Sequence, residues 1–241
     1  MKRTLQSSRI FREEARTRII ELAKKEFISK GIRQVKMDDF AHALAMSKRT
    51  LYQIFADKES LLLACLQERQ NYFKALAEKK QRETDNVLEI IVHDSYVRMQ
   101  WLREVSPLFF VEIGRYPRVM EYMTGERNRY IDHAVGFLQG GVEQGVFRKD
   151  VDFRLVMSLL LVQMNRAIAE HFYEVFSPAE VFRHQVVFFF RGCTTAKGMA
   201  QMDALIEGNG PPAVSGTEPV EALMRACSCP ASGVSAIRRL C

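Results

Sequence analysis

Residues 37–62 read MDDFAHALAMSKRTLYQIFADKESLL, and this stretch decides the fold of the N-terminal region. Two aspartates after Met37 favour a helix start, because carboxylates stabilise the positive N-terminal end of a helix. A helix over residues 37–44 is followed by the turn Ala45-Met46-Ser47, and Ser47 is a good N-cap for a second helix over residues 48–55. The spacing predicts a helix-turn-helix whose inward side chains are Met37, Phe40, Ala41, Leu44, Leu51 and Phe55.

The second helix of this pair carries polar side chains opposite its apolar face, and a helix of this kind fits the major groove of DNA. Long donors on it reach base edges, whereas Thr50, Tyr52 and Lys58 are placed for phosphate oxygens. Lys36 can meet a phosphate with help from the N-terminus of the first helix. The base-reaching residues are Lys48, Arg49 and Gln53, and the predicted DNA contacts are Lys36, Ser47, Lys48, Arg49, Thr50, Tyr52, Gln53 and Lys58.

The charge of the chain lies in the same region. The net charge is +6, and residues 1–60 carry 14 Lys and Arg against 8 Asp and Glu, while the remainder is balanced. A local excess of cations favours binding to a polyanion. A membrane surface would also attract it, but would call for exposed apolar anchors. The basic N-terminal run has two interpretations, an arm entering the minor groove or a disordered, solvated tail; it comprises Lys2, Arg3, Arg9, Arg12, Arg16 and Arg18.

The rest of the chain also follows a helical period, and no stretch alternates as a strand does. The fold class is therefore all-α. We expect a first helix over residues 9–30 that ends at Gly31, and later helical or apolar segments over residues 87–105, 108–113, 122–142, 153–176 and 178–190. The expected domains are residues 1–57 for DNA binding, residues 58–207 as a larger helical domain, and residues 208–241 as a disordered tail rich in Gly and Pro.

The composition also bears on the cellular compartment. The longest apolar run is residues 186–190, far short of the ~20 residues that span a membrane. The N-terminus lacks the apolar stretch of a secretory signal. The five cysteines form no evenly spaced disulfide framework and indicate reduced thiols. We therefore expect a cytoplasmic protein that contacts no membrane.

The helix-turn-helix resembles that of the TetR (tetracycline-repressor-like) family. That family shows a Gly-Val-Ser turn, then Lys-Gly-Thr-Leu-Tyr-x-x-Phe and a Ser-Lys-Glu-x-Leu-Leu helix start, where this chain has AMS, KRTLYQIF and DKESLL. Two residues depart from the pattern. Ala45 replaces the usual Gly, so the turn is either less left-handed or mildly strained. Arg49 replaces a small residue and adds a group that reaches bases or phosphates. Outside residues 10–65 only the helical layout resembles the family.

The resemblance implies a transcriptional regulator rather than an enzyme, and commonly a repressor that a small-molecule effector releases from a palindromic operator. It implies that the larger domain binds this effector and forms a homodimer. Ordinary core packing is the alternative interpretation of the residues chosen for either role. The candidate effector pocket comprises His93, Met99, Trp101, Phe109, Phe110, Met123, Phe137, Gln163 and Met164. The candidate dimer interface comprises Val156, Leu160, Phe182, Val186, Phe189 and Phe190.

Motifs for other chemistry are absent from the sequence. There is no Gly-x-Ser-x-Gly, no phosphate-binding Gly-rich loop and no pair of histidines at metal-ligand spacing. We therefore expect no catalytic residues, no metal and no cofactor. The alternative function is that of an α-helical protein whose basic N-terminal region serves non-specific nucleic-acid or protein interactions.

Overall fold

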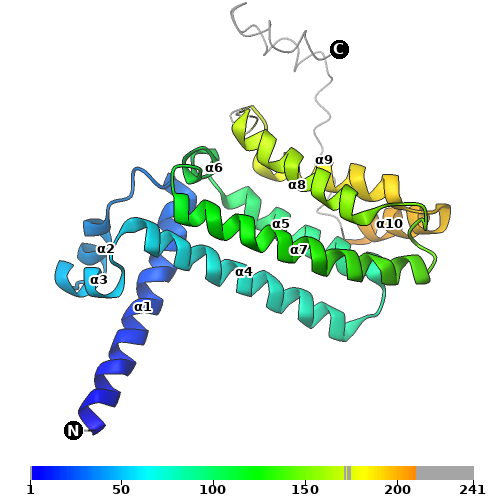
Figure 1. Cartoon of the computed structure of the whole chain (residues 1–241). Helices are drawn as coiled ribbons and strands as arrows, with labels where there is room; N and C mark the ends of the chain where they lie inside the picture. The colour runs from blue at the N-terminus through cyan, green and yellow to red at the C-terminus, as the bar shows by residue number, and fades with distance from the viewer. Residues whose placement is uncertain (1, 171, 173–174, 210–241) are drawn as a thin grey trace, which may run out of the picture. The chain divides into compact units, whose positions relative to one another are not determined.

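The computed structural model of the chain describes residues 2–170, 172 and 175–209. The chain divides into two compact units, Met1–Ile206 and Glu207–Cys241, and the helices lie in the first unit except for the end of the last one. The described residues form an all-α fold, as predicted (Figure 1). The N-terminal helices are α1 (Lys2–Lys30), α2 (Met37–Ala43), α3 (Lys48–Ile54) and α4 (Lys58–Glu83).

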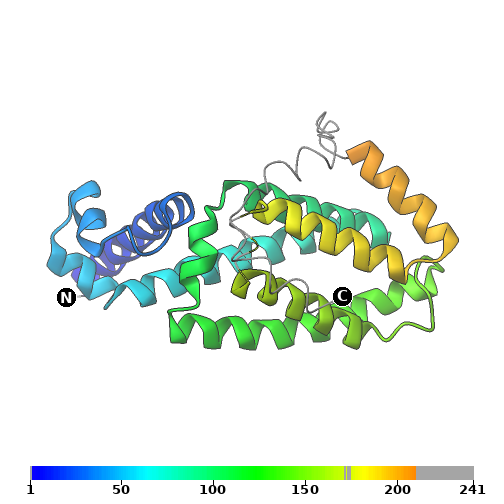
Figure 2. The same cartoon turned by 90° about the horizontal axis from the view of Figure 1, so that it is seen from above.

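The remaining helices build the larger part of this unit. They are α5 (Val87–Glu104), α6 (Pro107–Ile113), α7 (Pro117–Glu143), α8 (Phe153–Ala169), α9 (Pro178–Cys193) and α10 (Ala196–Asn209). α5 packs against α4, α7 and α9, and α8 packs against α7 and α9. Figure 2 shows α8 and α9 running side by side. No helix among the described residues is long and apolar enough to cross a membrane.

The helix ends follow from side-chain caps that the sequence contains. Ser47 accepts a hydrogen bond from the Thr50 N–H at the start of α3, and Asp57 accepts one from the Ser60 N–H at the start of α4. Ser177 and Glu180 form a capping box at the start of α9. The predicted N-cap at Ser47 is therefore confirmed.

Two backbone positions have positive φ at the ends of N-terminal helices. Gly31 has φ of +80° and ends α1, as predicted. Ala45, which replaces the usual Gly of the turn, has φ of +50°. The turn is therefore left-handed, and the alanine accepts the conformational cost that a glycine avoids.

One buried core joins the four N-terminal helices to α6 and the start of α7. Ile19, Ile20, Phe27, Phe40 and Leu51 are at most 1% exposed, and Phe27 meets Phe40 edge to face with ring centroids 5.7 Å apart. The same cluster takes in residues from the segment around α6: Val105, Phe109, Ile113 and Val119. The helix-turn-helix therefore shares its core with the larger domain.

Several element boundaries differ from the sequence-based expectations. α1 begins at Lys2 rather than at Arg9, so the basic N-terminal run is helical rather than an extended arm. α8 ends at Ala169, whereas the apolar pattern predicted one segment to Phe176. α10 was not predicted. Residues 210–241 of the expected tail lie outside the described residues.

Candidate nucleic-acid interface

Helix α3 is held by its apolar face and presents the opposite face outward. Leu51 is 0% exposed and Phe55, directly after α3, is 5% exposed. Arg16 of α1 lies over the Phe55 ring, with Cζ 5.7 Å from its centroid. Because a helix buries only one stripe, Lys48, Arg49, Tyr52 and Gln53 are left exposed on the other side. This is the arrangement that a helix needs to lie in the major groove.

The exposed face of α3 carries long hydrogen-bond donors, and side-chain hydrogen bonds hold the first turn of this helix. Lys48 Nζ lies 2.5 Å from the carboxylate of Asp38 on α2, and this hydrogen bond raises the pKa of Lys48. Ser47 and Thr50 share a hydrogen bond of 2.8 Å between their hydroxyls. The side chain of Lys48 remains 67% exposed. Lys48, Arg49 and Gln53 therefore stand together on one exposed surface, with Lys48 drawn toward α2.

The residues flanking α3 differ in whether their side chains are exposed or bonded to the protein. Lys36 is exposed at the start of α2, and its backbone N–H donates to Asp39. Tyr52 is 46% exposed. Lys58, in contrast, turns inward: its Nζ donates to the backbone oxygens of Ile32 at 2.8 Å and Arg33 at 3.4 Å. Burial lowers the pKa of Lys58. The assignment of Lys58 to a DNA phosphate is therefore corrected, since its ammonium satisfies carbonyls after α1.

Sequence reasoning missed a contact from α1 to the recognition helix. Arg12 Nη2 donates to the backbone oxygen of Gln53 at 2.6 Å. The carbonyls of the last turn of a helix have no partner inside the helix, and a basic side chain satisfies them well. Arg12 lies within the helix predicted from residue 9, but the sequence pattern gave no sign of its pairing with α3.

The family model described as bacterial regulatory proteins, tetR family, matches residues 19–65. This stretch holds α2, α3 and the adjoining parts of α1 and α4. Residues 19–65 form a TetR-family DNA-binding domain. Members of this family are DNA-binding transcriptional regulators and not enzymes, so the helix-turn-helix described above is the DNA-binding part of this chain.

Solved structures share the fold across most of the chain. A transcriptional regulator from Saccharomonospora viridis, solved in complex with choline, is 19% identical, with a TM-score of 0.61, over 76% of this chain and 99% of that one. TetR-family regulators from Agrobacterium tumefaciens and Haloarcula marismortui are 14% and 16% identical. Both have a TM-score of 0.60 over 76% of this chain and 100% of theirs. No curated protein sequence matches the chain.

The DNA-binding helices of this chain are tied to α6 by a buried carboxylate. Glu112 is 8% exposed, and its Oε2 accepts hydrogen bonds from the backbone N–H groups of Ile32 at 2.6 Å and Arg33 at 2.7 Å. The N–H of Ser106, just before α6, donates to the backbone oxygen of Ile28 at 2.8 Å. The end of α1 therefore rests on α6.

A second link joins the start of α7 to the start of α4. Arg118 pairs with Asp57 at 2.7 Å and with Glu59 at 3.0 Å. Its backbone N–H also donates to Glu59. Asp57 caps α4 directly after the helix-turn-helix. The segments before α2 and after α3 are therefore both bonded to the region of α6 and the start of α7.

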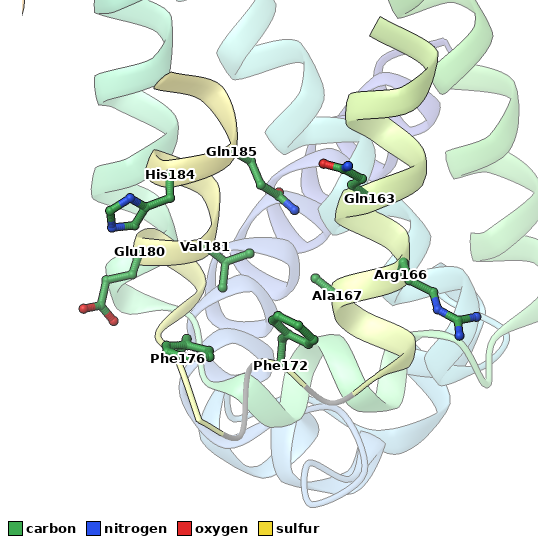
Figure 3. A pocket seen from close by; sticks show the side chains of 9 residues that line it. All are labelled: Gln163, Arg166, Ala167, Phe172, Phe176, Glu180, Val181, His184 and Gln185. Atoms are coloured by element: carbon green, nitrogen blue, oxygen red, sulfur yellow. The ribbon is translucent and has the colours of Figure 1, made fainter. Parts of the chain in front are cut away.

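A cavity of about 450 Å³ lies between α8 and α9. Figure 3 shows its polar side chains on both helices, together with two phenylalanines from the connecting segment. Phe172 and Phe176 are 48% and 44% exposed, so the cavity opens to the surface. Its lining residues are Gln163, Arg166, Ala167, Phe172, Phe176, Glu180, Val181, His184 and Gln185.

The predicted effector-pocket residues are distributed over several clusters rather than one cavity. Only Gln163 lines the cavity between α8 and α9. Phe109 belongs to the core shared with the helix-turn-helix, against which Trp101, Phe110 and Met123 also pack. Phe137 and Met164 pack on the core around α7 and α8. Met99 packs with Leu102 and Ala179. His93 is half-buried, and its Nδ1 has no hydrogen-bond partner among the described residues.

The predicted dimer residues face the interior of the chain. Leu160 and Val186 are 5% and 8% exposed. The others are partly buried against the chain's own clusters: Val156, Phe182, Phe189 and Phe190. Helical periodicity did not separate the inner stripe of α8 and α9 from the outer one, because both stripes are apolar, and the dimer interface stays a prediction. The outer stripes hold Leu155, Leu159 and Val162 on α8 and Phe188 on α9, which are 47–77% exposed.

Cysteines and metal-ligating side chains are the other candidates for a chemical role. Cys65 and Cys193 are buried free thiols, and burial raises the pKa of Cys65 to about 12. In the described ranges no group of His, Cys, Asp and Glu is arranged to hold a metal ion. The other three cysteines lie beyond residue 209, outside the described residues.

Proposed function

We propose that this chain is a cytoplasmic, homodimeric TetR-family repressor that binds a palindromic operator and leaves it when a small effector binds the helical body. The exposed face of α3, with Lys48, Arg49 and Gln53 opposite the buried Leu51, carries the sequence-reading part of this proposal. Arginine to guanine is the commonest specific base contact, so Arg49 is the main reader.

The homodimer is supported by apolar side chains that the chain leaves exposed on adjacent helices. Leu155, Leu159 and Val162 follow one another at helical spacing along α8, and Phe188 on α9 is 77% exposed. Exposed apolar patches of this kind mark association surfaces. A second copy of the chain covers such a surface with the same surface, and a two-fold dimer places two recognition helices on one palindrome.

Release by an effector is supported by the contacts that join α6 to the DNA-binding helices. Glu112 holds the end of α1, and Arg118 holds the start of α4. A ligand that binds better when α6 is displaced shifts the chain to a form with the wrong spacing for DNA. The choline complex of the Saccharomonospora viridis regulator supports a small-molecule site in this fold.

The DNA part is tested by fluorescence anisotropy with duplexes from the region flanking the chain's own gene, at several salt concentrations. We expect tight binding to one palindromic duplex and a steep loss of affinity with salt. Lys74→Ala, an exposed lysine of α4 outside the helix-turn-helix, is the matched control and leaves binding unchanged. Equally weak binding to all duplexes would favour the alternative, a basic region with non-specific nucleic-acid or protein partners.

The dimer is tested by sedimentation of the full chain. We expect the double variant Leu159→Glu, Phe188→Glu to sediment as a monomer and to lose most of its operator affinity. Tyr72→Glu changes another exposed apolar side chain, on α4, and leaves the dimer intact. A wild-type monomer, or a double variant that still dimerises, contradicts the assignment of this surface.

A further inference from the structure

A largely buried guanidinium in α4, that of Arg69, has two nitrogens without a hydrogen-bond partner among the described residues. Arg69 stacks on Trp101 of α5, with its Cζ 3.8 Å from the ring centroid. The two nitrogens are Nε and Nη1, and both are buried. Burial lowers the pKa of Arg69 to about 10. A guanidinium remains protonated at neutral pH even so, and a buried charge is costly unless a partner accepts its protons.

The indole of Trp101 presents a second buried donor at the same place. Its Nε1 has no acceptor among the described residues. The guanidinium stacks on this ring, so the unpartnered donors of both side chains belong to one stacked pair. Two donor side chains, one of them charged, call for an acceptor with negative charge and more than one oxygen. A carboxylate has both, and its planar geometry matches the guanidinium.

The surroundings of this pair are apolar and aromatic. Phe73 and Phe110 meet the Trp101 ring edge to face, at centroid distances of 5.9 Å and 6.4 Å. Tyr96 and Phe182 pack in the neighbouring cluster with Met99 and Leu102. Such walls suit the hydrocarbon or aromatic body of a ligand, while a few polar groups fix its orientation. A cation such as choline is disfavoured beside a largely buried guanidinium.

We propose that Arg69 and Trp101 bind the carboxylate of a small organic acid with an apolar body, and that this acid is the effector. The second half rests on the function proposed above. The site lies between α4 and α5, and both helices lead to the links with the DNA-binding helices. α4 begins at the cap formed by Asp57, and α5 is followed directly by the Ser106 contact with Ile28. Trp101 and Phe110 also pack against the core of the helix-turn-helix.

Trp101 is the only tryptophan of the chain, so its fluorescence reports on this site alone. The full-length protein is titrated with octanoate and phenylacetate, and with octanamide and phenylacetamide as neutral counterparts. We expect at least one carboxylate to change the fluorescence saturably and to bind at least tenfold more tightly than its amide. Equal binding of acid and amide, or no response to either carboxylate, overturns the proposal.

Variants test whether the Arg69 guanidinium itself, rather than any nearby positive charge, binds the carboxylate. Arg69→Met is expected to weaken carboxylate binding at least tenfold, whereas Arg103→Met, which removes an exposed arginine two residues after Trp101, leaves binding unchanged. Circular dichroism checks that Arg69→Met folds. If it does not, Arg69→Lys takes its place, since lysine keeps the charge but lacks the planar fork, and a clear loss is again expected. Unchanged carboxylate binding in the folded Arg69 variant overturns the proposal.

Operator binding is measured separately, so the two proposals fail in different ways. We expect Arg69→Met to bind operator DNA like the wild type but to remain bound when the carboxylate is added. If neither carboxylate binds while DNA binding persists, the ligand inference fails and the DNA-binding function stands. If the carboxylate binds through Arg69 but the wild-type protein stays on its operator, the effector role fails and the anion site stands.

Discussion

The guanidinium of Arg12 on α1 donates a hydrogen bond of 2.6 Å to the backbone oxygen of Gln53 at the end of α3. The contact joins two helices whose paired residues are 41 positions apart. It satisfies one carbonyl of the last turn of α3 and places a positive charge at the negative end of that helix. The orientation of the recognition helix is therefore set partly by α1.

Arg12→Ala is expected to weaken operator binding several-fold while changing the melting temperature little, because the contact that it removes is exposed to solvent and such charged surface contacts stabilise the fold by at most about 1 kcal/mol. Anisotropy with operator DNA and thermal unfolding measure the two effects. Arg18→Ala is the matched control, since Arg18 is an exposed arginine of the same helix. An equal loss of affinity in both variants would show that charge alone matters.

Gly31 lies where the end of α1 meets α6, and we expect its replacement by alanine to destabilise the fold. Its φ is +80°, and an added Cβ would lie 3.0 Å from both Glu112 Oε2 and Leu108 Cβ. The left-handed conformation alone costs a side chain roughly 1–2 kcal/mol. Urea unfolding of Gly31→Ala should show at least this loss in the free energy of unfolding.

Gly114→Ala provides the comparison, because a Cβ there has no neighbour within 4 Å and the φ of Gly114 is −60°. We expect this variant to unfold within about 0.5 kcal/mol of the wild type. Equal stability of the two alanine variants would contradict the importance of the contact between Gly31 and α6.

The sequence predicted those features of the site that arise from residues close together along the chain. Ser47, Leu51 and Phe55 define a capped helix with one buried side, and these features need only helical spacing. The contacts of Glu112 with Ile32 and Arg33 join residues about 80 positions apart, so no local pattern shows them. Lys58 was misassigned for the same reason, because the carbonyls that hold it come from the segment after α1.

The pair of Asp57 and Arg118 predicts a dependence of stability on pH. The hydrogen bond from the Ser60 N–H, and then the contact with Arg118, lower the pKa of Asp57. A lowered pKa in the folded state stabilises the fold above the ordinary pKa of aspartate, and this contribution is lost as the pH falls through the lowered value. Asp57→Asn keeps an N-cap but removes the charge.

We therefore expect wild type to exceed Asp57→Asn in stability by up to about 1 kcal/mol at neutral pH, since half-exposed ion pairs are screened by solvent. The difference should shrink below the ordinary pKa of aspartate and also at high salt. Urea unfolding over a range of pH measures it. A difference that stays constant into the acid range would assign the effect to packing rather than to charge.

Arg49 tests whether the exposed face of α3 reads sequence. Arg49→Ala removes a base-reaching donor, so affinity for the operator should fall by about 1–3 kcal/mol while affinity for a scrambled duplex falls less. Lys36 is exposed at the start of α2 and is assigned to a phosphate, so Lys36→Ala should weaken both duplexes alike and reduce the salt slope by about 1. Anisotropy on the two duplexes measures both variants. A loss from Arg49→Ala that is the same for operator and scrambled DNA would place Arg49 on the backbone, because only contacts with base edges distinguish one sequence from another.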